Sequence, residues 1–87
     1  DISGRGMLCY DVPIVQEKIG AMDTVLISEF FEGLARNAGI TLHIKKLAGE
    51  DPHHTAEAVF KSFARALSAA VAISSRVKGV PSTKGVL

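Results

Sequence analysis

Hydrophobic residues recur at helical spacing in the first third of the chain. Between residues 22 and 37 the apolar positions follow three- and four-residue steps, at Met22, Val25, Leu26, Phe30, Leu34 and Ala38. Asp23 or Thr24 is placed to cap the start of such a helix, and Gly39 stands where a left-handed residue commonly ends one. We therefore predict a helix over residues 22–37.

A second and clearer helix start follows at Asp51. Asp51 is a favourable N-cap residue, and Pro52 suits the first helical position because its missing N–H is not needed there. One sector of this predicted helix holds the apolar residues Ala56, Val59, Phe60, Phe63, Leu67 and Ala70. We predict that this face packs on a sheet, with His53, Glu57 and Lys61 as a polar seam along its border.

Short runs of β-favouring residues predict strands. Residues 7–15 favour extended structure but contain Pro13, so we predict a strand that ends near the proline or lies at a sheet edge. Apolar and polar residues alternate over part of residues 40–47, which predicts a strand with one solvent-exposed face. Within these strands we predict that His43 is hydrogen-bonded in or near the core and that Cys9 is a small buried side chain.

Composition limits the possible functions. A chain of 87 residues forms at most one domain, which buries too little surface to be very stable without a metal or a partner. Its 47% hydrophobic content is high for a small monomer and indicates surface covered in an oligomer. The net charge of +1 is too weak to attract nucleic acid or anionic lipid. A single cysteine, no secretory signal and no bilayer-length apolar run lead us to expect a cytoplasmic protein without membrane or nucleic-acid partners.

The strongest chemical motif is His-His-x-x-Glu at the start of the second predicted helix. His53 and Glu57 lie one turn apart, so an imidazole and a carboxylate can bind the same divalent ion. His54 is rotated by about 100° and points elsewhere, so one motif can serve two metals. Nitrogen and oxygen donors together suit Mn, Fe or Zn better than Ca or Mg. For the motif alone, two surface histidines beside an ordinary glutamate remain an even alternative.

A second set of residues could bind a phosphate group. The chain after Ser74 has turn residues without periodicity, which predicts a loop or tail. This segment and the rest of the chain together supply cations and hydroxyl groups at Arg5, Lys61, Ser82, Thr83 and Lys84. Each of these side chains taken singly is more often a solvated surface group, so the prediction depends on their combination.

These segments together resemble the imidazoleglycerol-phosphate dehydratase family. Residues 53–67 resemble the second signature of the family, and residues 81–87 resemble its C-terminal signature. Residues 1–5 and 39–44 also match family segments in the same order. The resemblance covers essentially all 87 residues and implies that residues 1–87 are a single half-domain, the C-terminal repeat of a two-repeat enzyme.

The resemblance implies an α+β fold and a manganese centre. Each half-domain is expected to have a four-stranded sheet with two helices packed on one face, as in ribosomal protein S5 domain 2-like folds. By that similarity His53 and Glu57 bind one Mn ion and His54 binds the other. Further ligands are expected from the N-terminal half or from neighbouring subunits of a large homo-oligomer. Glu29 stands where some members have a histidine ligand, so it is a further metal candidate.

The implied reaction is the Mn-dependent dehydration of D-erythro-imidazole glycerol phosphate to imidazole acetol phosphate in histidine biosynthesis. As a hypothesis for its mechanism, the metal-bound imidazolate expels the neighbouring hydroxyl to give a diazafulvene. Glu57 and His54 are then the catalytic candidates. The residues expected to bind the substrate, chiefly through its phosphate, are Arg5, His53, Lys61, Ser82, Thr83 and Lys84.

A non-catalytic reading of the same residues stays open. The family has a second His-His-x-x-Glu segment in its other half, and these 87 residues hold only one. The chain alone is therefore expected to form an incomplete site. The alternative function is a metal-assembled structural half-domain, or an inactive fragment of the enzyme.

Overall fold

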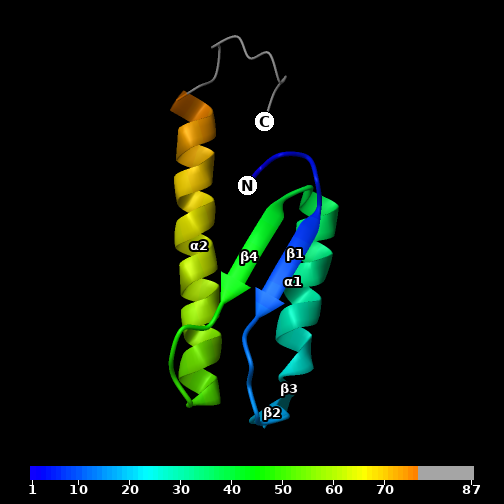
Figure 1. The fold of residues 1–87 in the computed structure, drawn as a ribbon, viewed down its shortest axis with the longest axis vertical. Helices are drawn as coiled ribbons and strands as arrows, with labels where there is room; N and C mark the ends of the chain where they lie inside the picture. The colour runs from blue at the N-terminus through cyan, green and yellow to red at the C-terminus, as the bar shows by residue number, and fades with distance from the viewer. Residues whose placement is uncertain (77–87) are drawn as a thin grey trace.

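The computed structural model describes residues 1–76 as two layers, with a small sheet covered by two helices (Figure 1). Along the chain the elements are β1 (Met7–Asp11), β2 (Lys18–Ile19), β3 (Met22–Asp23), α1 (Val25–Ala38), β4 (Thr41–Lys45) and α2 (Pro52–Arg76). β1 pairs with β4 in parallel, and α1 connects them. β2 and β3 form a separate antiparallel hairpin. The predicted α+β class is confirmed.

The two faces of the parallel sheet differ in burial. The register places Tyr10 beside Ile44, which face the helices, and Cys9 beside His43, which are exposed on the opposite face. Successive side chains of a strand point to opposite faces, so the helices can cover only one set. The prediction that Cys9 and His43 lie in or near the core is wrong, because the described part of the chain supplies no layer over their face.

The core lies between the helices and the sheet. Phe31 of α1 is 0% exposed and contacts the rings of Phe30, Phe60 and Phe63 at centroid distances of 5.1, 5.1 and 5.2 Å. The other buried members of this core cluster are Val12, Ile27, Ile44, Ala56 and Val59. Edge-to-face and tilted aromatic pairs at these separations attract beyond their area burial. The four phenylalanines therefore pack the two helices together.

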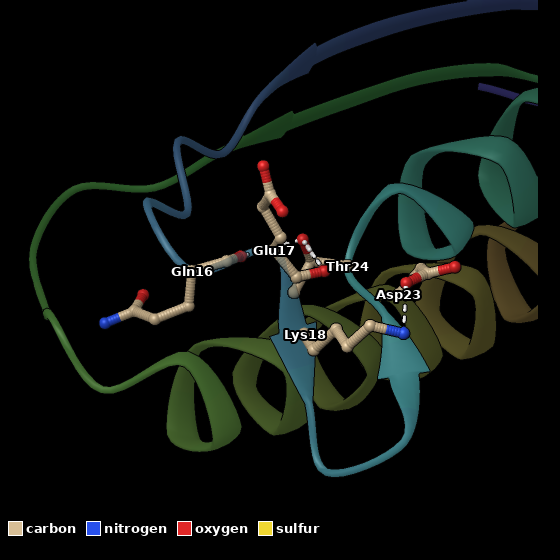
Figure 2. Close-up of polar contacts among 5 residues, drawn as sticks. All are labelled: Gln16, Glu17, Lys18, Asp23 and Thr24. Carbon is tan, nitrogen blue, oxygen red and sulfur yellow. Dashed lines mark hydrogen bonds and ion pairs between the residues drawn. The ribbon is translucent and has the colours of Figure 1, made fainter.

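α1 begins later than its apolar spacing predicted, because the preceding residues form the hairpin. Across the hairpin, the Lys18 ammonium lies 3.0 Å from the Asp23 carboxylate (Figure 2). The hydroxyl of Thr24 donates to the carbonyls of Gln16 and Glu17 at 2.9 and 3.1 Å. Thr24 makes no side-chain capping bond to α1. Its hydroxyl instead secures the base of the hairpin.

The last turn of α1 packs tightly against the N-terminal segment. Gly39 ends the helix in the predicted left-handed conformation, with φ at 66°, and its N–H donates to the carbonyl of Ala35. Gly6 lies directly against this turn. A Cβ atom on Gly6 would be 2.7 Å from the Cα of Arg36 and 2.8 Å from the Ala35 carbonyl oxygen. Only glycine fits this approach without movement of the backbone.

α2 packs on the core through its first half only. Ala56 and Val59 are buried, whereas Phe60 and Leu67 of the same predicted sector are 41% and 38% exposed. The later turns extend beyond the sheet, and the helix runs to Arg76 rather than ending near residue 74 (Figure 1). In residues 1–76 no helix combines the length and apolar character that crossing a membrane requires.

The described residues form two separate two-stranded sheets, whereas the resemblance implied one sheet of four strands. β2 and β3 have two residues each and pair with one another. On the edge of β4 away from β1, the amino group of Asp1 donates to the Thr41 carbonyl at 2.7 Å, and the Thr41 N–H donates to the Asp1 carbonyl at 2.8 Å. These two hydrogen bonds join Asp1 to the edge of β4 that lies away from β1.

The close approach of Gly6 leads to a stability prediction. Gly6→Ala should lower the free energy of unfolding by about 1–3 kcal/mol, the usual effect of overpacking, because the methyl group meets backbone atoms. Gly33→Ala is the matched control, since a Cβ there meets open space within α1 and should stabilise by about 0.5–1 kcal/mol. Urea unfolding of both variants measures the difference. Equal effects would show that the N-terminal segment does not pack against α1.

Candidate functional site

The first turns of α2 bring a histidine and a glutamate into contact. Nε2 of His53 meets Oε1 of Glu57 across one helical turn, as the spacing predicted. The two side chains are 65% and 49% exposed, so water reaches both. An imidazole and a carboxylate held this way form half of a chelating set for a divalent ion.

His54 contacts a different carboxylate from His53. Its ring centroid lies 6.0 Å from that of His53, with 63° between the ring planes. Its nearest carboxylate is that of Asp51, with Oδ2 at 4.0 Å from Nδ1 of the ring. The two rings are therefore neighbours, and their service to two different ions stays a prediction from the rotation between adjacent helical residues.

Asp51 caps α2, as its sequence position predicted. Its Oδ1 accepts the backbone N–H of His54 at 3.0 Å. This hydrogen bond lowers the pKa of Asp51 below its ordinary value, and the nearby imidazoles of His54 and His53 add smaller effects in the same direction. The cap fixes where α2 begins, and with it the directions in which both histidines leave the helix.

An open groove runs beside the His53–Glu57 pair. It is lined by Ile19, Met22, His53, Ala56, Glu57, Phe60 and Lys61. Lys61 follows Glu57 by one turn, so a cation stands next to the pair in the same groove, as the predicted polar seam requires. Ile19 and Met22 come from the hairpin and were not among the predicted site residues. No local signal could have found them, because only tertiary packing brings the hairpin to α2.

Glu29 lies in a different place from the histidine motif. It lines a second groove between β1 and α1, together with Leu8, Tyr10, Ser28, Glu32, Gly33 and Arg36. In this groove the Arg36 guanidinium is 2.6 Å from the Glu32 carboxylate, and burial raises the pKa of Tyr10. The fold of one chain thus does not join Glu29 to His53 and Glu57.

Arg5 lies at the far end of the sheet from the histidines. Its carbonyl accepts the Thr41 hydroxyl at 3.1 Å, where β4 starts, whereas His53 follows the end of β4. The length of a strand separates these two residues within the chain. The remaining predicted phosphate ligands, Ser82, Thr83 and Lys84, lie outside the described residues.

The described part of the chain contains no complete metal site. Among residues 1–76, no group of three or more His, Cys, Asp or Glu side chains is placed to hold an ion. His53 with Glu57 offers two donors, and His54 offers one. A complete site at either place needs ligands from outside this part of the chain.

Comparison with known proteins assigns the chain to one group. A family profile described as imidazoleglycerol-phosphate dehydratase matches residues 1–67. The chain is 55% identical to the imidazoleglycerol-phosphate dehydratase of Symbiobacterium thermophilum and 57% identical to that of Nitrobacter hamburgensis. These matches cover 100% of the chain but only 42% and 45% of the two relatives, so the chain spans less than half of their length.

A solved structure agrees with the sequence matches. The fold is similar to the crystal structure of imidazoleglycerol-phosphate dehydratase from Staphylococcus aureus, with a TM-score of 0.75 and 46% sequence identity. The match covers 77% of this chain and 39% of the solved one.

The lowered pKa of Asp51 predicts how the α2 cap responds to acid. A carboxylate whose pKa falls on folding stabilises the folded state above its unfolded pKa, about 3.9, and loses that contribution as pH falls through the folded pKa. Asp51→Asn keeps a capping oxygen that does not titrate. The Tm of the native protein should therefore drop relative to that of Asp51→Asn between about pH 5 and pH 2.

Glu50→Gln provides the control for this measurement. It removes an exposed neighbouring carboxylate that is not the cap. The Tm difference between Glu50→Gln and the native protein should change less over the same pH range. A native protein and an Asp51→Asn variant with parallel Tm profiles would contradict the capping role of the Asp51 carboxylate.

Proposed function

The chain belongs to the imidazoleglycerol-phosphate dehydratase family, in which it corresponds to the C-terminal half, and we propose that the protein carrying it dehydrates D-erythro-imidazole glycerol phosphate to imidazole acetol phosphate. The reaction is a carbon–oxygen lyase step of histidine biosynthesis, and its expected location is the cytoplasm. One observation supports the proposal above all others: His53 and Glu57 meet at the start of α2, beside a second histidine, in a chain whose relatives carry this name.

The donor atoms at the start of α2 fit manganese. Nε2 of His53 and Oε1 of Glu57 already face each other, so both can turn onto one ion. A mixed imidazole and carboxylate set suits a borderline first-row ion. Bound manganese would supply a Lewis acid and a template for the imidazole of the substrate.

The arrangement supports two ions, each bound partly by this chain and partly by residues of other chains or of the N-terminal half. His53 and Glu57 would hold one ion, and His54, directed elsewhere, would hold the other. Manganese prefers about six ligands, more than either place offers in residues 1–76. Glu29 lines a separate groove, so if it is a ligand it completes the site of another half-domain.

The proposed substrate-binding residues, like the proposed metal ligands, are divided between different half-domains. Lys61 lines the groove of the His53–Glu57 pair, where it would neutralise the substrate phosphate or hold its hydroxyl group. Arg5 is a strand length away from that groove, so we place it against substrate bound in a different half-domain. Ser82, Thr83 and Lys84 complete the proposed phosphate clamp on the basis of sequence.

Proton transfer is assigned to groups that reach the groove and the solvent. Dehydration removes a hydroxyl group and a hydrogen from adjacent carbons, so one group must accept a proton and one must donate. If Oε1 of Glu57 holds the ion together with Nε2 of His53, the other carboxylate oxygen of Glu57 is the atom that would take the proton. His54, with a side chain that is 80% exposed, would act through the ion that it holds, which would polarise the leaving hydroxyl.

The four-stranded sheet and the oligomer belong to the same proposal. The mutual hydrogen bonds of Asp1 and Thr41 have the antiparallel form, so residues preceding Asp1 in the whole protein would continue along β4. Further apolar area is exposed on both helices, at Val25, Leu26 and Phe30 of α1 and at Phe60, Leu67, Val71 and Ile73 of α2. Such a surface on a small domain indicates burial in an assembly.

The same surface also suits the alternative function, a metal-assembled structural half-domain without catalysis.

Activity of the intact protein separates these functions. His54→Ala should lower the rate of Mn-dependent dehydration by more than about 100-fold. Removing a residue that only hydrogen-bonds to a metal ligand costs about 10- to 100-fold, and removing the ligand itself should cost more. His43→Ala is the matched control, since His43 is exposed on the opposite face of the sheet. Unchanged activity after His54→Ala, or no Mn-dependent activity in the native protein, would contradict the proposal.

Metal removal should also affect assembly. If each ion joins ligands from different half-domains or subunits, a chelator should shift the protein to smaller species, and added Mn²⁺ should restore the large one. Light scattering coupled to size-exclusion chromatography measures this change. An assembly of constant mass under both conditions would mean that contacts other than metal bonds hold the subunits.

A further inference from the structure

The two carboxylates at the start of α2 stand in different relations to their histidines. Glu57 meets His53 at Nε2, from the following turn of the helix. Asp51 approaches His54 at Nδ1, from the residues before the helix. The nitrogen that faces a carboxylate therefore differs: it is Nε2 in His53 and Nδ1 in His54.

The position of the Asp51 carboxylate is restricted by its bond to the backbone. Oδ1 accepts the N–H of His54 at 3.0 Å, so the carboxylate cannot turn away without breaking the cap. The other carboxylate oxygen, Oδ2, then faces the imidazole of His54 and lies 4.0 Å from its Nδ1. This distance is an ion-pair contact rather than a hydrogen bond, and a small rotation of the exposed ring would close it.

We propose that Asp51 is a positioning residue for His54. Its Oδ1 anchors the backbone of the helix start, and its Oδ2 holds the Nδ1 side of the ring, so that Nε2 is directed outward as the metal-binding atom. The inference rests on the proposed function, because it assumes that His54 binds one of two manganese ions. Glu57 then shares an ion with His53, whereas Asp51 stands behind His54 and touches no ion.

A carboxylate behind a ligating histidine has a known physical effect. It accepts the N–H of the ring nitrogen that is not bound to metal, which fixes the tautomer and orientation of the ring and makes the other nitrogen a better donor. In this chain the same side chain also begins the helix. The orientation of His54 and the start of α2 are thereby set together.

Serine at position 51 separates the two roles. Asp51→Ser keeps an oxygen that can cap the helix but removes the second oxygen, which faces the ring. Asp51→Asn also keeps the cap, and its amide cannot accept the Nδ1–H of His54. Glu50→Gln is the control, because it removes a neighbouring exposed carboxylate outside the contact with the ring.

The test is a titration of the metal-free intact protein with Mn²⁺ alone, counting the bound ions by the magnetic resonance signal of free Mn²⁺. Two ions should bind for each copy of this half-domain in the native intact protein. In Asp51→Ser and Asp51→Asn one of the two affinities should fall by about 10- to 100-fold, with the other affinity and the Tm of the metal-free protein nearly unchanged. Glu50→Gln should leave both affinities as they are.

A second readout uses the metal-free protein and does not depend on activity. Nitrogen NMR of histidine-labelled protein should show His54 mainly with its proton on Nδ1, and a mixture of tautomers in Asp51→Ser. Unchanged Mn²⁺ affinities together with an unchanged tautomer in the variants would overturn the positioning role alone. Equal weakening of both ions would assign Asp51 to the helix cap only. A native protein that binds no Mn²⁺ would overturn the proposed function as well.

Discussion

The burial of Phe31 is the contact on which the rest of the structure depends. Its ring is enclosed by aromatic side chains from α2 and by apolar side chains from the sheet. Removing a phenylalanine side chain from water stabilises a fold by roughly 1.5–3 kcal/mol, and the aromatic contacts add to this. It also fixes the first half of α2 against α1, which brings the His53–Glu57 pair beside the hairpin and forms the groove.

The same packing leaves the half-domain unfinished on several sides. The outer face of the sheet and the later turns of α2 lack a covering layer in the described residues, and Asp1 alone is hydrogen-bonded to the edge of β4 away from β1 there (Figure 1). The functional side chains show the same incompleteness. His53 and His54 leave the helix in different directions, Glu29 lines another groove, and Arg5 lies beyond the opposite end of the sheet. These uncovered surfaces and scattered candidate side chains support the proposal that the working unit is larger than this chain.

Exposure decides what the site can do without a metal. The His53 and Glu57 side chains are in contact but reach water, so their mutual attraction is screened and contributes little to folding. In the proposed function the pair serves as a set of metal donors rather than as a structural salt bridge. The N-terminus of a helix repels a cation weakly, and the Glu57 carboxylate offsets this effect. Asp51 adds a second negative charge at the same helix end.

The sequence by itself determined the local features. Asp51 and Pro52 defined the start of α2, Gly39 defined the end of α1, and the i, i+4 spacing placed His53 beside Glu57. These features depend on backbone geometry over a few residues, which the sequence specifies directly. The family signatures in the same residues indicated the α+β class and the family.

Only the tertiary structure decided which faces are covered. Cys9 and His43 looked like core residues in their strands, and they are exposed because both helices lie on the other face of the sheet. Because residues 22 and 23 belong to the hairpin, α1 begins at Val25 and not at residue 22 as predicted. The hairpin also places Ile19 and Met22 in the wall of the groove. The distance from Arg5 to the histidines likewise follows from strand direction. Such features arise from contacts between distant segments, which side-chain periodicity along one element cannot encode.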